Sequence, residues 1–122
     1  MMSQMLKAKI QELTVTESCL DYPGSISLPN DLMQAAGIKQ FELVHVNNKT
    51  NGNRIVTYAV KNKQEGRVTI NGAASLLFKK GDAVHVLAFA FLNESEVDVF
   101  LPTLVITDKA NSLLESKPYV FD

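Results

Sequence analysis

Hydrophobic and polar residues alternate along much of the chain with the two-residue period of half-buried β-strands. Over residues 5–15, apolar side chains occupy every second position as far as Ile10, and the phase then reverses at Leu13. A β-bulge produces such a reversal, because one extra residue moves the following side chains to the opposite face. The pattern therefore predicts a strand over 5–15 with a bulge, or a change of partner strand, near Glu12.

Further strands are predicted where β-branched and aromatic residues cluster between turn formers. They cover residues 25–28, 41–46, 54–60, 67–70, 83–91 and 98–107, with Pro102 interrupting the last. The 83–91 segment is the most apolar, and we expect it to be the most buried strand. The tail, residues 108–122, contains no recognisable chemistry.

Two short helices are predicted between the strands. The first has Asn30 as N-cap, Asp31 in the first turn and Gly37 as the residue that ends it in a left-handed conformation. One or two helical turns are predicted over residues 73–78.

Glycine-containing turns connect several of these elements. Asn51-Gly52 is a strong hairpin signal, and Asn71-Gly72 is a second turn. Tyr22-Pro23-Gly24-Ser25 has the form of a type II turn, because proline presets φ near −65° and glycine accepts a positive φ at the next position. From the residues alone this segment is simply a well-formed turn.

Short strands separated by regularly spaced turns predict a mainly β fold, a small β-barrel with short helices. The 122 residues fit a single domain, with no repeat or linker that marks a second one. A chain of this length buries roughly two-thirds of the surface that it exposes when unfolded, which suffices for a core without metal or disulfide.

Composition and charge narrow the function classes. Twelve basic and 13 acidic residues give a net charge of −1, without the basic cluster that nucleic-acid binding requires. The single cysteine, Cys19, cannot form an internal disulfide, and we expect it to be a small buried residue. The N-terminus lacks a signal-peptide pattern and the longest apolar run, residues 83–92, is too short to span a bilayer, so we expect a cytoplasmic protein without a membrane partner.

Several separated motifs, in order over about residues 5–90, resemble the aspartate 1-decarboxylase family. They are Lys9, Tyr22 with Gly24-Ser25, Ala35-Ala36-Gly37, Thr50-Asn51-Gly52, Arg54, Thr57-Tyr58, Asn71-Gly72-Ala73-Ala74 and Gly81-Asp82-Ala83-Val84. The resemblance implies a double-ψ β-barrel, a homotetramer, and an inactive proenzyme that cleaves itself between Gly24 and Ser25. The products would be chains 1–24 and 25–122.

The resemblance also implies the chemistry of the mature enzyme. The Ser25 hydroxyl attacks the Gly24 carbonyl, and Ser25 ends as a covalently bound pyruvoyl group that forms a Schiff base with the substrate amine. L-aspartate would then lose CO₂ and yield β-alanine, a precursor of pantothenate and coenzyme A. Neither a metal nor pyridoxal phosphate is expected, whereas an accessory maturation factor is a candidate partner.

Roles for the other site residues follow from the same resemblance. Thr57 would stabilise the oxyanion during cleavage and Tyr58 would donate the proton after decarboxylation. Arg54 and Lys9 would bind the carboxylates of the substrate. The segment that borders the pyruvoyl group would comprise Asn71, Gly72, Ala73 and Ala74.

Without the resemblance, simpler interpretations stay open. Lys9 and Arg54 read as exposed surface charges, Thr57 and Tyr58 as ordinary strand residues, and Asn71-Gly72 as a turn. The alternative function is a non-catalytic double-ψ barrel that serves as a binding or assembly module. A swapped-hairpin DNA-binding barrel is disfavoured by the charge balance.

Three positions depart from the family pattern. Gln11 stands where relatives often have histidine, Asn47 where several have tryptophan, and His85 where an apolar residue is usual. We interpret them as changes at the pocket rim or at subunit contacts, with consequences for substrate affinity and pH dependence.

Overall fold

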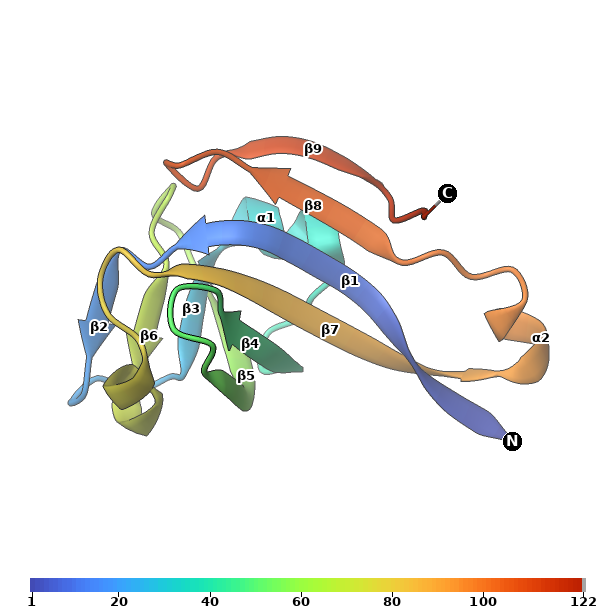
Figure 1. Ribbon diagram of the computed structural model, residues 1–122, viewed down its shortest axis with the longest axis horizontal. Coiled ribbons are helices and arrows are strands. Elements are labelled where there is room, and N and C mark those ends of the chain that lie inside the picture. Colours follow the sequence, from blue (N-terminus) through green and yellow to red (C-terminus); the bar gives the residue numbers. More distant parts are fainter. Residues whose placement is uncertain (122) are drawn as a thin grey trace.

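The computed structural model describes residues 1–121 and consists mainly of strands (Figure 1). The elements are β1 (Met2–Thr14), β2 (Glu17–Cys19), β3 (Ile26–Pro29), α1 (Asn30–Ala36), β4 (Leu43–Asn48), β5 (Arg54–Asn62), β6 (Thr69–Asn71), the 3₁₀ helix η1 (Gly72–Leu77), β7 (Ala83–Asn93), α2 (Glu94–Val97), β8 (Thr103–Thr107) and β9 (Leu113–Pro118). The prediction of a mainly β fold with short helices is confirmed.

All nine strands belong to one continuous sheet, in the order β2-β6-β3-β5-β4-β7-β1-β8-β9. The long strands β1 and β7 run side by side and antiparallel through the molecule, and β8 lies parallel to β1 on its other side (Figure 1). Within residues 1–121 the edge strands β2 and β9 do not pair, so backbone pairing leaves the sheet open. Because β6 separates β2 from β3, the segment that joins these two strands crosses over β6.

The predicted bulge in β1 is confirmed at Glu12. The pairing of β1 with β7 shifts register between Ile10 and Leu13, and Glu12 has a φ of 59°. The alternating apolar residues therefore face the interior on both sides of the bulge: Ile10 and Leu13 are fully buried. The Glu12 backbone, by contrast, turns toward β7.

The core lies between the sheet and α1. It collects Leu, Ile and Val side chains from most of the strands, Leu32 and Met33 from α1, and Phe78 just beyond η1. Gly37 ends α1 in the left-handed conformation, as predicted, with φ 69° and its N–H bonded to the Gln34 carbonyl. The N-cap prediction was wrong: the helix begins at Asn30 itself, Pro29 precedes it, and no side chain caps it.

Two burial predictions were also wrong. β7 is not the most buried strand, because its side chains alternate between the core and the outer face, while all three residues of β6 are buried. Cys19 is half-buried at the end of β2, because this edge strand has a neighbour on one side only.

The sequence pattern did not predict β2, β9 or α2. α2 is held by a capping box in which the Asn93 side chain accepts the N–H of Glu96 and the Glu96 carboxylate accepts the N–H of Asn93. Across residues 1–121, none of the helices is long and apolar enough to cross a lipid bilayer.

Candidate active site

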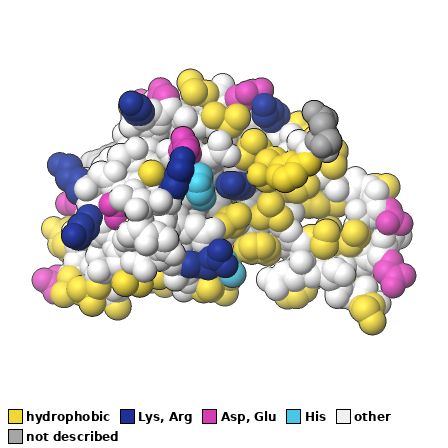
Figure 2. Space-filling view, in the orientation of Figure 1, with side chains coloured by type: hydrophobic (Ala, Val, Ile, Leu, Met, Phe, Trp, Pro, Cys, Tyr) yellow, Lys and Arg dark blue, Asp and Glu magenta, His cyan; other side chains and the backbone are white. Residues whose placement is uncertain are grey.

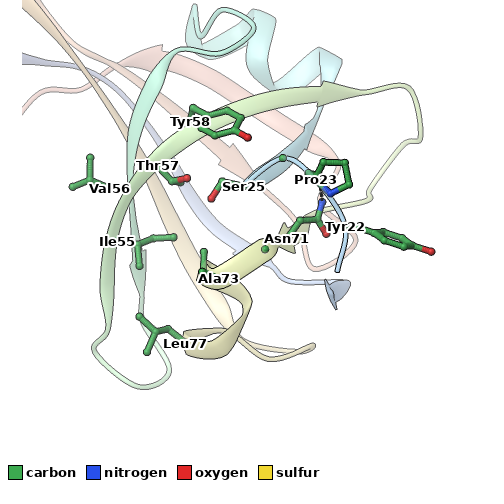
Figure 3. A pocket seen from close by; sticks show the side chains of 13 residues that line it. Tyr22, Pro23, Ser25, Ile55, Val56, Thr57, Tyr58, Asn71, Ala73 and Leu77 are labelled. Carbon is green, nitrogen blue, oxygen red and sulfur yellow. Dashed lines mark hydrogen bonds between the residues drawn. The ribbon is translucent and has the colours of Figure 1, made fainter. Parts of the chain in front are cut away.

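The bend between β2 and β3 lies at the edge of a pocket of about 500 Å³ (Figure 3). Three parts of the chain surround this pocket: the bend at residues 22–25, the first half of β5, and the junction of β6 with η1. We call it the Ser25 pocket. It is lined by Tyr22, Pro23, Gly24, Ser25, Ile55, Val56, Thr57, Tyr58, Asn71, Gly72, Ala73, Ala74 and Leu77.

Gly24 adopts the positive φ that the turn pattern predicted, with a value of 84°. Side chains rarely tolerate this conformation, and a Cβ at this position would lie 3.2 Å from Cγ2 of Val60 on β5. The residue before the Gly24–Ser25 peptide bond therefore has a backbone conformation that favours glycine.

Asn71 holds the bend on both sides of that peptide bond. Its backbone N–H donates to the carbonyl of Ser25 at 2.8 Å, and its side-chain amide donates to the carbonyl of Pro23 at 3.3 Å. The side chain is also fixed from behind, because Nδ2 lies 3.3 Å from Oγ1 of Thr69. A buried asparagine with these partners is more than the plain turn residue that Asn71-Gly72 alone indicates.

Two hydroxyl groups from β5 face the bend. The half-buried Thr57 points its hydroxyl toward that of Ser25, and the ring of Tyr58 lies over the same opening (Figure 3). Tyr58 is 40% exposed, so its phenol remains accessible to a molecule in the pocket. The site thus combines a nucleophilic hydroxyl, a second hydroxyl donor and a phenol.

Eight of the ten predicted site residues line the Ser25 pocket. They are Gly24, Ser25, Thr57, Tyr58, Asn71, Gly72, Ala73 and Ala74. The other two, Lys9 and Arg54, do not line it. Arg54 is exposed and lies opposite Asn47 in the pairing of β5 with β4, and Lys9 lies on β1 with its ammonium 5.8 Å from the ring centre of Tyr119.

The prediction of site residues missed five that line the pocket: Tyr22, Pro23, Ile55, Val56 and Leu77. Val56 could have been found, because it lies between Arg54 and Tyr58 on the same face of a predicted strand. Leu77 gave no signal, since its place at the pocket depends on how η1 packs against the turn between β4 and β5, where the Asn51 side chain donates to the Leu77 carbonyl.

The two titratable groups with shifted pKa values lie together at the β1 bulge. Burial, followed by the positive charges of Lys9 and Lys49, lowers the pKa of His85, whereas the Glu12 carboxylate opposes the shift. A hydrogen bond and ion pair with Lys49 lower the pKa of Glu12. Among residues 1–121, no three His, Cys, Asp or Glu side chains are grouped so as to hold a metal ion.

Comparison with known proteins gives the class of this mainly β protein, a decarboxylase. A family model described as "Aspartate decarboxylase" matches residues 1–114. The chain belongs to the aspartate decarboxylase family. This assignment agrees with the double-ψ β-barrel that the resemblance implies.

Relatives from several organisms are similar to this chain over almost their whole length. A protein named "Aspartate 1-decarboxylase" from Campylobacter jejuni (strain RM1221) is 43% identical over 115 residues, 94% of this chain and 91% of the relative. A protein of the same name from Xylella fastidiosa (strain M12) is 45% identical over 114 residues, 93% of this chain and 90% of the relative. One from Dehalococcoides mccartyi (strain CBDB1) is 39% identical, with shares of 93% and 92%.

Proposed function

We propose that the protein decarboxylates L-aspartate to β-alanine and CO₂, after cleaving itself between Gly24 and Ser25 into chains 1–24 and 25–122. The names of the relatives support L-aspartate as the substrate. The observation that carries the proposal is the Ser25 pocket, which gathers a constrained Gly24-Ser25 bond with Thr57, Tyr58 and Asn71.

Self-cleavage begins at the Ser25 hydroxyl. Its oxygen attacks the carbonyl carbon of Gly24, the C–N bond breaks, and an ester forms while the Ser25 nitrogen becomes a free amine. Elimination then releases the Gly24 carboxylate and leaves dehydroalanine, and water replaces the nitrogen, which leaves as ammonia. Thr57 donates its hydroxyl to the oxyanion that forms in the first step, and the bonds from Asn71 to the carbonyls of Pro23 and Ser25 keep the bend in place.

The residues around Ser25 fit a pyruvoyl group at this position. Asn71 already donates its N–H to the Ser25 carbonyl at 2.8 Å, and the small residues Gly72, Ala73 and Ala74 leave space beside it. Such a group supplies the electron sink for decarboxylation, in place of pyridoxal phosphate. Tyr58 delivers a proton from its phenol to the carbon that loses CO₂.

Arg54 and Lys9 bind the two carboxylates of the substrate, and this role requires more than one chain. Neither side chain lines the Ser25 pocket of its own chain. We therefore propose that the active form is an oligomer, a homotetramer by resemblance, in which Arg54 and Lys9 of one copy serve the Ser25 pocket of another. The cytoplasm is the proposed location, and an accessory maturation factor is a proposed partner.

Denaturing mass spectrometry of the purified protein tests self-cleavage. We expect two species, one ending at Gly24 and one that begins with a pyruvoyl group and is lighter than a serine-initiated chain by the mass lost with ammonia. Ser25→Ala should leave a single intact chain, and Ser27→Ala, on the adjacent strand, should cleave normally. A wild-type chain that stays intact after prolonged incubation contradicts the proposal.

A second assay tests the reaction itself. Cleaved wild-type protein should release CO₂ from L-aspartate, and Ser25→Ala should not. The alternative, a non-catalytic binding or assembly module, predicts a different result. Ser25→Ala would then behave like wild type, and the protein would contain no carbonyl group that reacts with borohydride.

A further inference from the structure

Strand register brings three polar residues into a row on the outer face of the sheet. Arg54 on β5 pairs with Asn47 on β4, and Asn47 pairs with His85 on β7. Directly paired residues of neighbouring strands carry their side chains on the same face. We call Arg54, Asn47 and His85 the polar row.

Lys9 lies on the same face, beside the polar row. It pairs with Leu87, which is two residues from His85 along β7 and therefore on the same side of the sheet. Figure 2 shows histidine and basic side chains together on one face of the molecule, next to a group of hydrophobic side chains. By the strand register, His85 shares a face of the sheet with Lys9 and Arg54, the two cations that are proposed to bind the carboxylates of the substrate.

The β1 bulge fixes the orientation and the tautomer of the His85 ring. The backbone N–H of Glu12 donates to Nδ1 of His85 at 3.1 Å. A neutral imidazole that accepts at Nδ1 carries its proton on Nε2, so Nε2–H is the donor that His85 offers. Within residues 1–121 this Nε2–H makes no hydrogen bond, and it is free to bind a ligand.

Charges around His85 favour this neutral form. Burial and the nearby Lys9 and Lys49 lower its pKa, while the Glu12 carboxylate is already engaged by Lys49. Arg54 adds a further positive charge two strands away. His85 therefore contributes a neutral donor to a surface whose positive charge comes from Lys9 and Arg54.

Asn47, in the middle of the row, has an unpaired acceptor. Among the described residues, its Oδ1 is the buried side-chain polar atom without a hydrogen-bond partner. Such atoms are uncommon because an unpaired buried acceptor is costly. Asn47 therefore leaves an acceptor in the row that receives no donor from residues 1–121.

We propose that His85 is a substrate-binding residue that selects dicarboxylic amino acids by donating its Nε2–H to one of the two carboxylates that Arg54 and Lys9 bind. The inference rests on the proposed function and deepens it. The family resemblance marked His85 as a departure at the pocket rim or at a subunit contact, with consequences for substrate affinity. The hydrogen bond from Glu12 orients the His85 ring, and the strand register places this ring in one row with Arg54, which indicates a carboxylate as its ligand.

Steady-state kinetics of cleaved variants test the role of His85. A hydrogen bond to a charged group contributes enough that His85→Leu should raise KM for L-aspartate about 10-fold, with kcat near the wild-type value. His85→Gln should recover most of the affinity, because the glutamine amide also offers an N–H donor. His45→Leu is the matched control, since His45 lies on the same face but outside the row, and its KM should stay near that of wild type.

NMR of ¹⁵N-histidine-labelled wild-type protein tests the same role without a variant that must fold. At pH 7, His85 should show a protonated Nε2, whose resonance shifts when L-aspartate is added but not with L-alanine, which lacks the second carboxylate. Protonation at Nδ1 instead, or an unchanged KM in His85→Leu, overturns the inference while wild-type activity keeps the proposed function intact. Cleaved wild-type protein that does not act on L-aspartate overturns both.

Discussion

The Ser25 pocket and the polar row are assembled in different ways. The pocket is complete within one chain, because the bend, β5 and the β6–η1 junction meet around Gly24 and Ser25. The polar row is an open surface across β5, β4 and β7, and it has an unpaired acceptor at its centre. We infer that one chain can assemble the proposed bond-breaking site, whereas the proposed carboxylate-binding groups act only together with a second chain.

This contrast assigns separate consequences to mutations in the two regions. Changes in the Ser25 pocket should affect cleavage or the chemical step of a single chain. Changes in the row should leave cleavage intact and affect substrate binding between chains. Four predictions, in order of decreasing effect, test this separation.

Tyr58→Phe should give the largest effect. It removes the phenol that we propose as proton donor but keeps the ring, so cleavage should proceed and kcat should fall about 10²–10⁴-fold. Intact mass and steady-state kinetics on one preparation measure both. Tyr119→Phe, which changes the tyrosine next to Lys9, is the matched control and should retain activity; a Tyr58→Phe enzyme with normal kcat removes Tyr58 from its role.

Thr57→Val should slow self-cleavage by about 10²–10³-fold, because it replaces the oxyanion donor by a side chain of similar shape. Thr57→Ser keeps the hydroxyl and should cleave at a rate closer to wild type. The rate is followed by the appearance of the two chains in denaturing mass spectrometry. Equal rates for Thr57→Val and wild type would mean that the hydroxyl facing Ser25 has no part in cleavage.

Arg54→Ala should cleave normally but lose about 10–10²-fold in kcat/KM, because a charge-assisted carboxylate contact disappears. Arg67→Ala is the control: Arg67 pairs with Glu17 away from the pocket, and such exposed ion pairs contribute little. Kinetics on fully cleaved protein measure both variants.

Mixing variants sharpens the Arg54 prediction. Co-expressed Ser25→Ala and Arg54→Ala chains should form oligomers more active than either variant alone, since the intact row of one copy can serve the intact pocket of the other. If the mixed oligomers are no more active than the Arg54→Ala chains that they contain, the pocket and the row act within the same chain.

The smallest predicted effect is on stability. Because the folded chain lowers the pKa of His85 from 6.5, the unfolded chain binds this proton more readily. The free energy of unfolding should therefore fall as pH drops below about 6.5 and continue to fall until the folded imidazole titrates, by less than about 1 kcal/mol for this partly exposed group. Urea unfolding measures this effect: between pH 8 and pH 5.5, the free energy of unfolding should fall less for His85→Leu than for wild type.

Local patterns predicted the parts of the fold that are locally determined. The phase reversal after Ile10 located the Glu12 bulge, and the glycine signal located the end of α1 at Gly37. β9 was not predicted, because all of its residues are exposed and its sequence therefore shows no alternation of apolar and polar positions. The capping box of α2, with Asn93 three residues before Glu96, is a sequence signal for a helix start that hydrophobic periodicity does not reveal.

The sequence allowed the residues of the candidate site to be named, but it did not show how they are arranged in space. Resemblance named Gly24, Ser25, Thr57 and Asn71, and the chain brings them to one pocket. It also named Lys9 and Arg54, yet nothing in the order of residues indicates that they lie apart from that pocket. The polar row was beyond sequence reasoning as well, because it depends on the pairing register of three strands.

The crossing of the 22–25 bend over β6 has a consequence for the protein after cleavage. A cut between Gly24 and Ser25 removes the covalent link between β2 and β3, but β6 still pairs with both of them, and β1 keeps its partners β7 and β8. The cleaved protein that we propose is then a naturally split protein, whose short chain is retained without a covalent link, by strand pairing and by buried side chains such as Ile10 and Leu13. Its two chains should elute together without denaturant, and its unfolding, unlike that of the uncut chain, should depend on dilution.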